Sequence, residues 1–290
     1  MNLFTYDFML RALAGALVVG LATPALGIYL VQRRLSLIGD GIGHVALTGV
    51  GLGLLLQTSP VLTAVAVAAT AAVAMELVRE RGRTSGDVAL AILFYGGIAG
   101  GVALVQVSTQ HSNANLLSYL FGSLLTTTQT DLIAIAVLSA AVFAVCLFGR
   151  PWLFAVCQDE EYARVSGLPV RALNLTLAVT TAVTVTVAMR AVGLLLVSAL
   201  MVVPVATAQQ FTRGFNTTMY VSMALGFVAA GTGVVISASS DTSPGATIVL
   251  VAIGMFITVT LATAVARAAR RHLPSSTAPQ PEPPEVVLEL

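Results

Sequence analysis

Long apolar stretches separated by short polar segments dominate the chain. Nine of them are long enough to cross a bilayer as α-helices, which takes about 17–25 residues. A further apolar stretch, Leu116–Leu125, is too short to cross, and we predict a re-entrant or interfacial helix there. The nine candidate spans are Phe8–Val31, Leu35–Gln57, Val61–Val78, Val88–Val107, Asp131–Phe148, Ala172–Met189, Ala191–Gln210, Phe215–Ser237 and Ala246–Ala266.

The boundary around Arg190 is the least distinct one, because two candidate spans meet there with almost no loop. If one of the two is a half-helix, the number of spans falls to eight and the side of the N-terminus has to be reassigned. Composition agrees with a membrane protein, since 57% of the residues are hydrophobic and only 9% are charged, against about 25% charged residues in soluble domains. The sequence therefore predicts an all-α polytopic membrane protein with eight or nine transmembrane helices.

The arginines predict the orientation in the membrane. With the N-terminus outside and an odd number of crossings, Arg11 and Arg190 lie on the outer side, and all other arginines lie inside. Such an excess of positive charge is typical of cytoplasmic loops. The net charge of +1 and the lack of a large basic patch argue against nucleic acid as a partner. The inner arginines are Arg33, Arg34, Arg79, Arg81, Arg83, Arg150, Arg164, Arg171, Arg213, Arg267, Arg270 and Arg271.

Two ionisable residues occur near the start of the second candidate span. Asp40 and His44 are four residues apart, so on a helix both side chains project from one face. An ionisable residue inside a membrane span is costly and indicates a functional site. A carboxylate and an imidazole suit a first-row divalent metal. The structural alternative is that Asp40 caps the helix and His44 packs as a neutral side chain between helices.

The longest polar interruption between spans runs over residues 149–171. Asp159, Glu160 and Glu161 suit the first turn of a short helix, where the helix dipole favours negative charge. Gly167 suits its end, and Pro169 follows. The segment is either an inert cytosolic connection or a docking helix for a cytosolic partner.

Four further features concern the remaining chain. Pro204 lies within a candidate span and predicts a kink, since proline removes a backbone donor. No Gly-Lys-Ser or Gly-Lys-Thr motif occurs, so we expect no ATP site in this chain. Residues 1–271 are predicted to form one transmembrane permease domain. The proline-rich tail, residues 272–290, is expected to be disordered, cytosolic and dispensable for transport.

Several motifs together resemble the membrane permease of the zinc- and manganese-type metal ABC importers. The resemblance covers about residues 8–268. The chain departs from the family pattern at Gly41–Gly43, where bulkier or hydroxylic residues are usual, and in its proline-rich tail. The matching pieces are Arg33–Asp40 with His44, Asp159–Glu161 leading to Ser166–Asn174, Gly193–Leu200 with Pro204–Ala208, and Ser243–Leu250.

The resemblance implies an all-helical permease that works as a homodimer, with the pore on the two-fold axis. It implies two cytosolic ATPase subunits that hold the ATP, an extracytoplasmic metal-binding protein, and a multi-pass location in a prokaryotic plasma membrane. Asp40 and His44 would belong to the metal pathway, and the segment from Asp159 to Pro169 would be the coupling helix. The transported ion would be zinc or manganese, with zinc first because imidazole favours it modestly.

Two other functions stay open. A secondary transporter or channel would need no ATPase, and inverted halves with interrupted helices would favour it. No such internal repeat is visible, and the cytosolic helix favours the importer. A membrane-embedded enzyme would have to use Asp40, His44 and also Glu76 or His111, and the chain has no nucleophile motif such as Gly-x-Ser-x-Gly.

Overall fold

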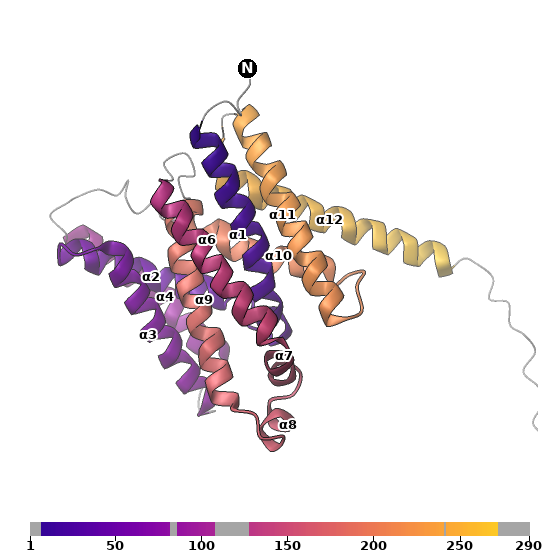
Figure 1. Ribbon diagram of the computed structural model, residues 1–290, viewed down its shortest axis with the longest axis horizontal. Coiled ribbons are helices and arrows are strands. Elements are labelled where there is room, and N and C mark those ends of the chain that lie inside the picture. Colours follow the sequence, from indigo (N-terminus) through magenta and orange to yellow (C-terminus); the bar gives the residue numbers. More distant parts are fainter. Residues whose placement is uncertain (1–6, 82–85, 108–127, 241, 272–290) are drawn as a thin grey trace, which may run out of the picture.

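The computed structural model describes residues 7–81, 86–107, 128–240 and 242–271, and this part of the chain is all-helical, as predicted. The expected re-entrant helix at Leu116–Leu125 and the tail from residue 272 lie outside these ranges. The elements (Figure 1) are α1 (Asp7–Gln32), α2 (Ile38–Leu55), α3 (Pro60–Glu80), α4 (Gly86–Val107), α6 (Gln129–Phe143), the π-helix η3 (Ala144–Phe148), α7 (Arg150–Gln158), α8 (Glu160–Val165), α9 (Val170–Val192), α10 (Leu194–Ala208), α11 (Phe215–Ser240) and α12 (Pro244–Arg271).

Within the described ranges, eight helices are long and apolar enough to cross a membrane, which confirms the lower of the two predicted counts. The expected full span over residues 191–210 is instead the 15-residue helix α10. At 1.5 Å per residue it is about 22 Å long, shorter than the roughly 30 Å of a hydrocarbon core. It begins after Gly193, whose φ of +87° interrupts the helix and suits a residue without a Cβ. Pro204 therefore lies in a short helix and not in a full span.

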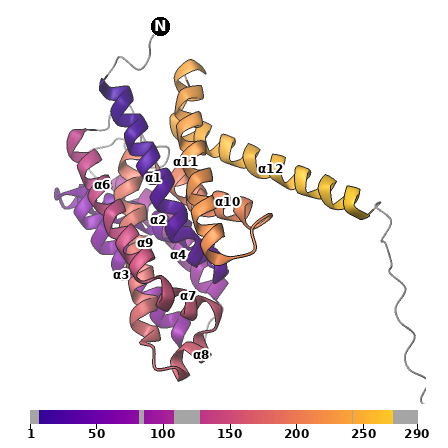
Figure 2. The same ribbon diagram turned by 45° about the vertical axis from the view of Figure 1, so that its right-hand side comes forward.

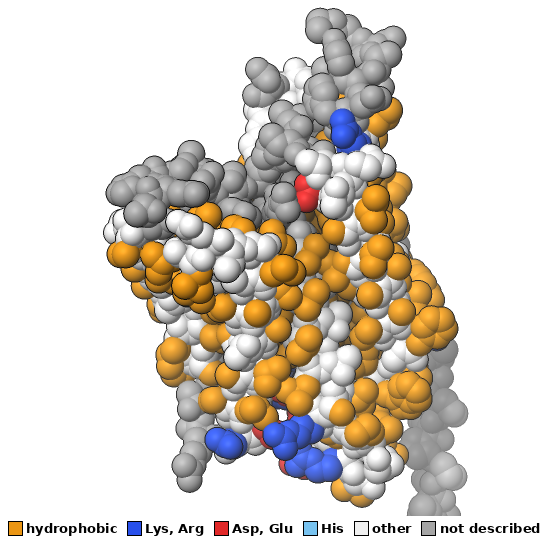
Figure 3. All heavy atoms as spheres, turned by 60° about the vertical axis from the view of Figure 1, so that its left-hand side comes forward, with side chains coloured by type: hydrophobic (Ala, Val, Ile, Leu, Met, Phe, Trp, Pro, Cys, Tyr) orange, Lys and Arg blue, Asp and Glu red, His pale blue; other side chains and the backbone are white. Residues whose placement is uncertain are grey.

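The ends of several helices meet at one end of the bundle. Here α1 and α6 end beside α7 and α8 (Figure 1). Ion pairs of Glu160 with Arg33 and Arg79 place the ends of α1 and α3 there as well. At the opposite end lies the start of α1. Arginine and carboxylate side chains gather at the α7–α8 end below a broad apolar belt (Figure 3). By the positive-inside rule, this end is expected to face the cytoplasm.

Close packing holds α2 against its neighbours. A Cβ on Gly97 in α4 would lie 2.5 Å from the backbone carbon of His44, and a Cβ on Gly43 would collide with Leu194. Gly49 packs in the same way against Ala64 of α3. Small residues of this kind let membrane helices approach closely. Of the glycines that depart from the family pattern, Gly43 thus places α2 against α10, and Gly41 packs against Leu90 of α4.

The last helix, α12, is packed less closely against the bundle than the other candidate spans among the described residues. α12 begins beside α10 and α11 and then points away from the bundle (Figure 2), although its second half still contacts the turn that follows α10 through Thr260 and Arg267. It is the least buried of the candidate spans within the described residues, with 11% of its most apolar window buried. Residues in the first turns of α10 and α12 line the same cavity as Asp40. Further along, Gln210 just after α10 donates a hydrogen bond to Thr260 of α12 over 2.8 Å, so the two helices run in the same direction.

Candidate metal pathway and coupling helix

Asp40 and His44 lie one turn apart on α2, as predicted. Asp40 is in the first turn, where the positive end of the helix dipole stabilises a carboxylate. Each residue has one buried polar atom without a hydrogen-bond partner among the described residues: Oδ1 of Asp40 and Nδ1 of His44. Buried polar atoms are normally paired. A carboxylate oxygen and an imidazole nitrogen are both donor types that can bind a divalent cation.

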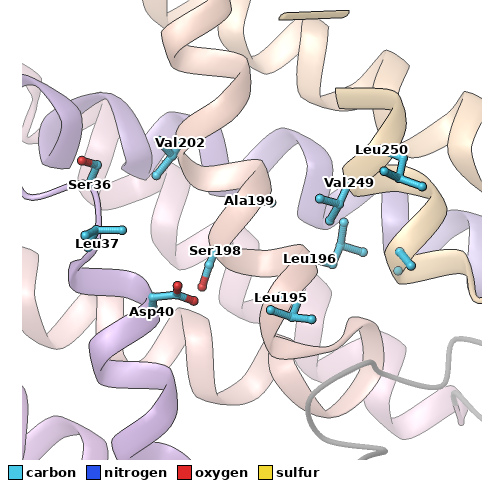
Figure 4. A pocket seen from close by; sticks show the side chains of 12 residues that line it. Ser36, Leu37, Asp40, Leu195, Leu196, Ser198, Ala199, Val202, Val249 and Leu250 are labelled. Carbon is cyan, nitrogen blue, oxygen red and sulfur yellow. The ribbon is translucent and has the colours of Figure 1, made fainter. Parts of the chain in front are cut away.

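The Asp40 side chain lines a cavity of about 550 Å³ formed by α2, α10 and α12 (Figure 4). Ser36, Asp40 and Ser198 supply the hydroxyl and carboxylate groups of its wall, and the remaining lining residues are glycine or apolar. A water molecule takes up about 30 Å³, so a cation with its hydration shell fits. Apolar walls around a carboxylate strengthen its attraction for a cation.

His44 faces the neighbouring helix more than the cavity. Its ring packs edge-to-face on Phe94 of α4, with the ring centroids 4.5 Å apart. It is 9% exposed and does not line the 550 Å³ cavity. The structure therefore brings Asp40 and His44 to one helix face but gives them different surroundings.

One chain offers few donors for a metal. Within the described residues, no group of three or more His, Cys, Asp or Glu side chains could hold a metal ion. Glu76 is occupied elsewhere, because Arg79 donates two hydrogen bonds to its carboxylate, at 2.7 and 3.0 Å. His111 lies outside the described residues. Since a zinc site usually has about four ligands, Asp40 and His44 of one chain form at most half of one.

The polar segment 149–171 contains two helices where the sequence predicted one. The missed helix is α7, which begins next to Pro151, a residue favoured in a first helical turn. The predicted one is α8, and Asp159 caps it by accepting a hydrogen bond from the Tyr162 amide over 2.9 Å. Gly167 ends it with φ +81°. The acidic start and the glycine stop are therefore both confirmed.

Glu160 points into the bundle and joins α8 to three other helices. Its carboxylate lies 3.3 Å from Arg33 at the end of α1 and 3.4 Å from Arg79 at the end of α3. It also accepts a hydrogen bond from Asn174 of α9 over 3.1 Å. By contrast, Glu161 is exposed. Of the three carboxylates in the predicted coupling segment, Asp159 thus caps α8, Glu160 holds it to the bundle, and Glu161 faces outward.

Burial also alters the titration of two groups near α8. It lowers the pKa of Arg33, and the nearby Arg79 cation lowers it further, whereas the Glu160 carboxylate opposes both effects. Burial raises the pKa of the Cys157 thiol to about 11, against the opposing effect of the Arg33 cation. Cys157 lies in α7, and its thiol donates to the Tyr29 carbonyl over 3.7 Å.

Comparisons with known proteins agree with this architecture. The sequence model of the ABC 3 transport family matches residues 5–263. The chain is 29% identical over 252 residues to the high-affinity zinc uptake system membrane protein ZnuB of Haemophilus influenzae, covering 87% of this chain and 96% of that protein. It is 29% identical over 256 residues to the manganese transport system membrane protein MntC of Halalkalibacterium halodurans, covering 88% and 87% of the two chains.

A solved structure has the same fold. PsaBC from Streptococcus pneumoniae, determined in complex with a Fab, contains a chain that superposes with a TM-score of 0.79 at 28% sequence identity. The match covers 89% of the present chain and 92% of that chain. The arrangement of helices around Asp40 thus belongs to a fold already seen in a solved membrane protein.

Proposed function

We propose that this chain, which belongs to the ABC 3 transport family, carries a divalent cation, zinc first and manganese second, through a pathway that includes Asp40 and His44. It is the membrane permease subunit of a metal ABC transporter, a multi-pass protein of a prokaryotic plasma membrane. The ATPase is a separate partner, as in the family as a whole.

The observation that supports this proposal most directly is the pair of unpaired buried atoms on α2, Oδ1 of Asp40 and Nδ1 of His44. Oδ1 of Asp40 is buried, has no partner among the described residues, and belongs to a side chain that lines a cavity large enough for a hydrated cation. A buried carboxylate oxygen without a partner is unfavourable, although the Asp40 side chain as a whole is only half-buried. A divalent cation passing through the cavity would supply the missing charge, and His44 would add a nitrogen ligand one turn further along α2.

A second copy of the chain would complete the donor set. Two subunits that meet beside Asp40 would bring two carboxylates and two imidazoles to one axis, which matches the number of ligands in a zinc site. The incomplete donor set among the described residues of one chain favours this homodimer over a pathway confined to a single subunit. An extracytoplasmic binding protein would deliver the cation to the outer end of the axis.

Coupling to the ATPase would run through α8. We assign Asp159 to the helix cap, Glu160 to the attachment of α8 to α1, α3 and α9, and Glu161 to the surface that two ATPase subunits would contact. Gly167 would let the chain turn back into α9. Pro204 lies buried in α10 beside α11 and α12, where it interrupts the backbone hydrogen bonds of the short helix.

The choice of zinc before manganese rests on the imidazole of His44, because nitrogen ligands favour zinc modestly. Relatives named for zinc and for manganese transport are equally similar to this chain, so the metal has to be measured. A secondary transporter or channel, the other transport function considered from the sequence, would carry metal without the ATPase.

Metal uptake in a deletion strain tests the proposal. Cells that express the chain with its ATPase and binding protein are supplied with zinc, manganese or iron separately. Asp40→Asn and His44→Ala should each abolish uptake at normal membrane abundance. The control is Asp131→Asn, at the opposite end of the bundle in the first turn of α6. Normal uptake by the Asp40→Asn, His44→Ala double variant would refute the pathway, and uptake without the ATPase would favour the alternative.

A further inference from the structure

Ser198 of α10 departs from the usual behaviour of hydroxyl residues in this protein. In buried helices, hydroxyl side chains commonly donate to a backbone carbonyl one turn earlier. Here Thr181 donates to Leu177 and Ser222 donates to Met219, both over 2.8 Å. The Ser198 hydroxyl oxygen is buried as well, yet it has no hydrogen-bond partner among the described residues.

The position of Ser198 indicates which group its unpaired hydroxyl can contact. Ser198 and Asp40 line the same cavity, and Figure 4 shows the hydroxyl and the carboxylate pointing toward one another from α10 and α2. Both contribute an unpaired buried oxygen. The walls around them are apolar, apart from Ser36 near the start of α2. Two unpaired oxygens that point toward one another in apolar surroundings form a place for a group that binds both.

We infer that the Ser198 hydroxyl contacts the transported cation, or one of its bound waters, from the side opposite Asp40, and so contributes to the choice of metal. This inference rests on the proposed function, in which the cation passes Asp40. The hydroxyl is neutral, so it adds an oxygen without adding charge. Its oxygen would take the place of one water of hydration as the cation enters the cavity.

The chemistry of the donor predicts the direction of the selectivity. Oxygen ligands suit manganese, whereas nitrogen and sulfur ligands shift a site toward zinc and its softer relatives. Ser198 therefore favours manganese, in opposition to the imidazole of His44. Removing the hydroxyl should weaken manganese transport more than zinc transport, and replacing oxygen by sulfur should reverse the preference.

Three variants test this in cells that contain the complete transporter. Ser198→Ala should raise the half-saturating concentration for manganese uptake on the order of tenfold, as expected for loss of a hydrogen bond to a charged group, with a smaller effect on zinc. Ser198→Cys should raise the ratio of zinc to manganese uptake at least several-fold and increase inhibition by cadmium. Ser222→Cys is the matched control, because Ser222 is buried in α11, lies outside the cavity and has a paired hydroxyl. It should keep the parent zinc-to-manganese ratio.

A binding measurement separates a transport defect from a folding defect. Cadmium and manganese retained by the purified full-length permease are counted for each variant and for Asp40→Asn. Higher cadmium retention by Ser198→Cys but not by Ser222→Cys supports the inference. Parent-like ratios in both Ser198 variants, with uptake abolished by Asp40→Asn, would overturn the Ser198 contact and leave the Asp40 pathway standing. Parent-like uptake by Asp40→Asn would instead refute the proposed function.

Discussion

The Arg33 guanidinium lies 3.3 Å from the Glu160 carboxylate, so the end of α1 is tied to the proposed coupling helix α8. The Arg33 side chain is 6% exposed and the Glu160 side chain 31%. Only a short turn separates Arg33 from Asp40. A displacement of α8 by a cytosolic partner would therefore act first on the turn that precedes the candidate metal ligand.

Glu160→Gln should destabilise the permease without its partners. The change removes the carboxylate that Arg33 and Arg79 share, and a buried donor left without its partner costs about 1–3 kcal/mol. Glu161→Gln is the matched control, since the adjacent carboxylate is exposed. Thermal unfolding of the purified chain in detergent should show a lower midpoint for Glu160→Gln only. Equal midpoints for both variants would contradict a stabilising ion pair between Arg33 at the end of α1 and Glu160 of α8.

The same pair of variants should separate attachment from docking. Glu161→Gln should reduce copurification of the ATPase while leaving the unfolding midpoint unchanged.

A double-mutant cycle of Arg33→Gln with Glu160→Gln should give a coupling energy of roughly 1 kcal/mol or more, because the two side chains are in direct contact. Additive effects of the two substitutions would show that the ion pair contributes nothing to stability.

Gly167 should tolerate asparagine better than proline. Its φ of +81° lies in the left-handed region, where asparagine is among the residues that fit with little strain and which proline cannot enter. A Cβ at this position would meet no heavy atom within 4 Å, so backbone strain alone decides the outcome. ATP-dependent uptake should be close to normal for Gly167→Asn and largely lost for Gly167→Pro. Equal uptake by the two variants would mean that the turn after α8 is not needed in this conformation.

Cys157 should react slowly with maleimides at neutral pH. Burial raises its pKa to about 11, so below that pH the thiol stays protonated, and the reactive thiolate is roughly one part in a thousand at pH 8. Labelling in a Cys146→Ala background should accelerate about tenfold per pH unit as the pH rises toward 11. Ser166→Cys, at an exposed position after α8, provides the reference rate. Equal labelling of both thiols at pH 7.5 would contradict the burial of Cys157.

The sequence predicts the local features of this protein better than its long-range contacts. The i, i+4 spacing is enough to place Asp40 and His44 on one face, and the acidic start and glycine stop are enough to find α8. The ion pairs of Glu160 cannot be predicted from the sequence, because the partners Arg33 and Arg79 lie 127 and 81 residues away in the chain. The sequence separates α9 from α10 but places the break at Arg190 and not at Gly193, since the break is a single glycine with positive φ within an apolar run.

Ser198 illustrates a second limit. A serine in an apolar helix ordinarily donates to its own backbone, so the sequence gives no reason to select it. Only the folded structure shows that Ser198 lines the same cavity as Asp40 and that its hydroxyl points toward the Asp40 carboxylate. The incomplete donor set within one chain is likewise a property of the folded structure. It leads to the question of which surface a second copy would cover.

Subunit contacts should involve the exposed apolar residues around the cavity and not the middle of α2. Most of α2 is buried within its own subunit, from Ile38 to Gly53. Beside the cavity, Leu37, Leu195 and Leu250 are 64%, 45% and 68% exposed. A shared axis next to Asp40 would cover these side chains, and the burial of apolar surface would stabilise the dimer through close packing in the membrane.

Single cysteines at Leu195 and Leu250 should therefore crosslink two subunits in an active transporter, in a background that lacks Cys146 and Cys157. Ile133→Cys is the control, because Ile133 is also apolar and 56% exposed but lies on α6, away from the cavity. Crosslinking at the cavity positions should diminish when manganese or zinc is bound between the subunits, if the ion fills the space beside Asp40. Crosslinking at Ile133 with none at Leu195 or Leu250 would place the subunit interface on the opposite side of the bundle. The donor set of Asp40 and His44 would then have to be completed within each subunit.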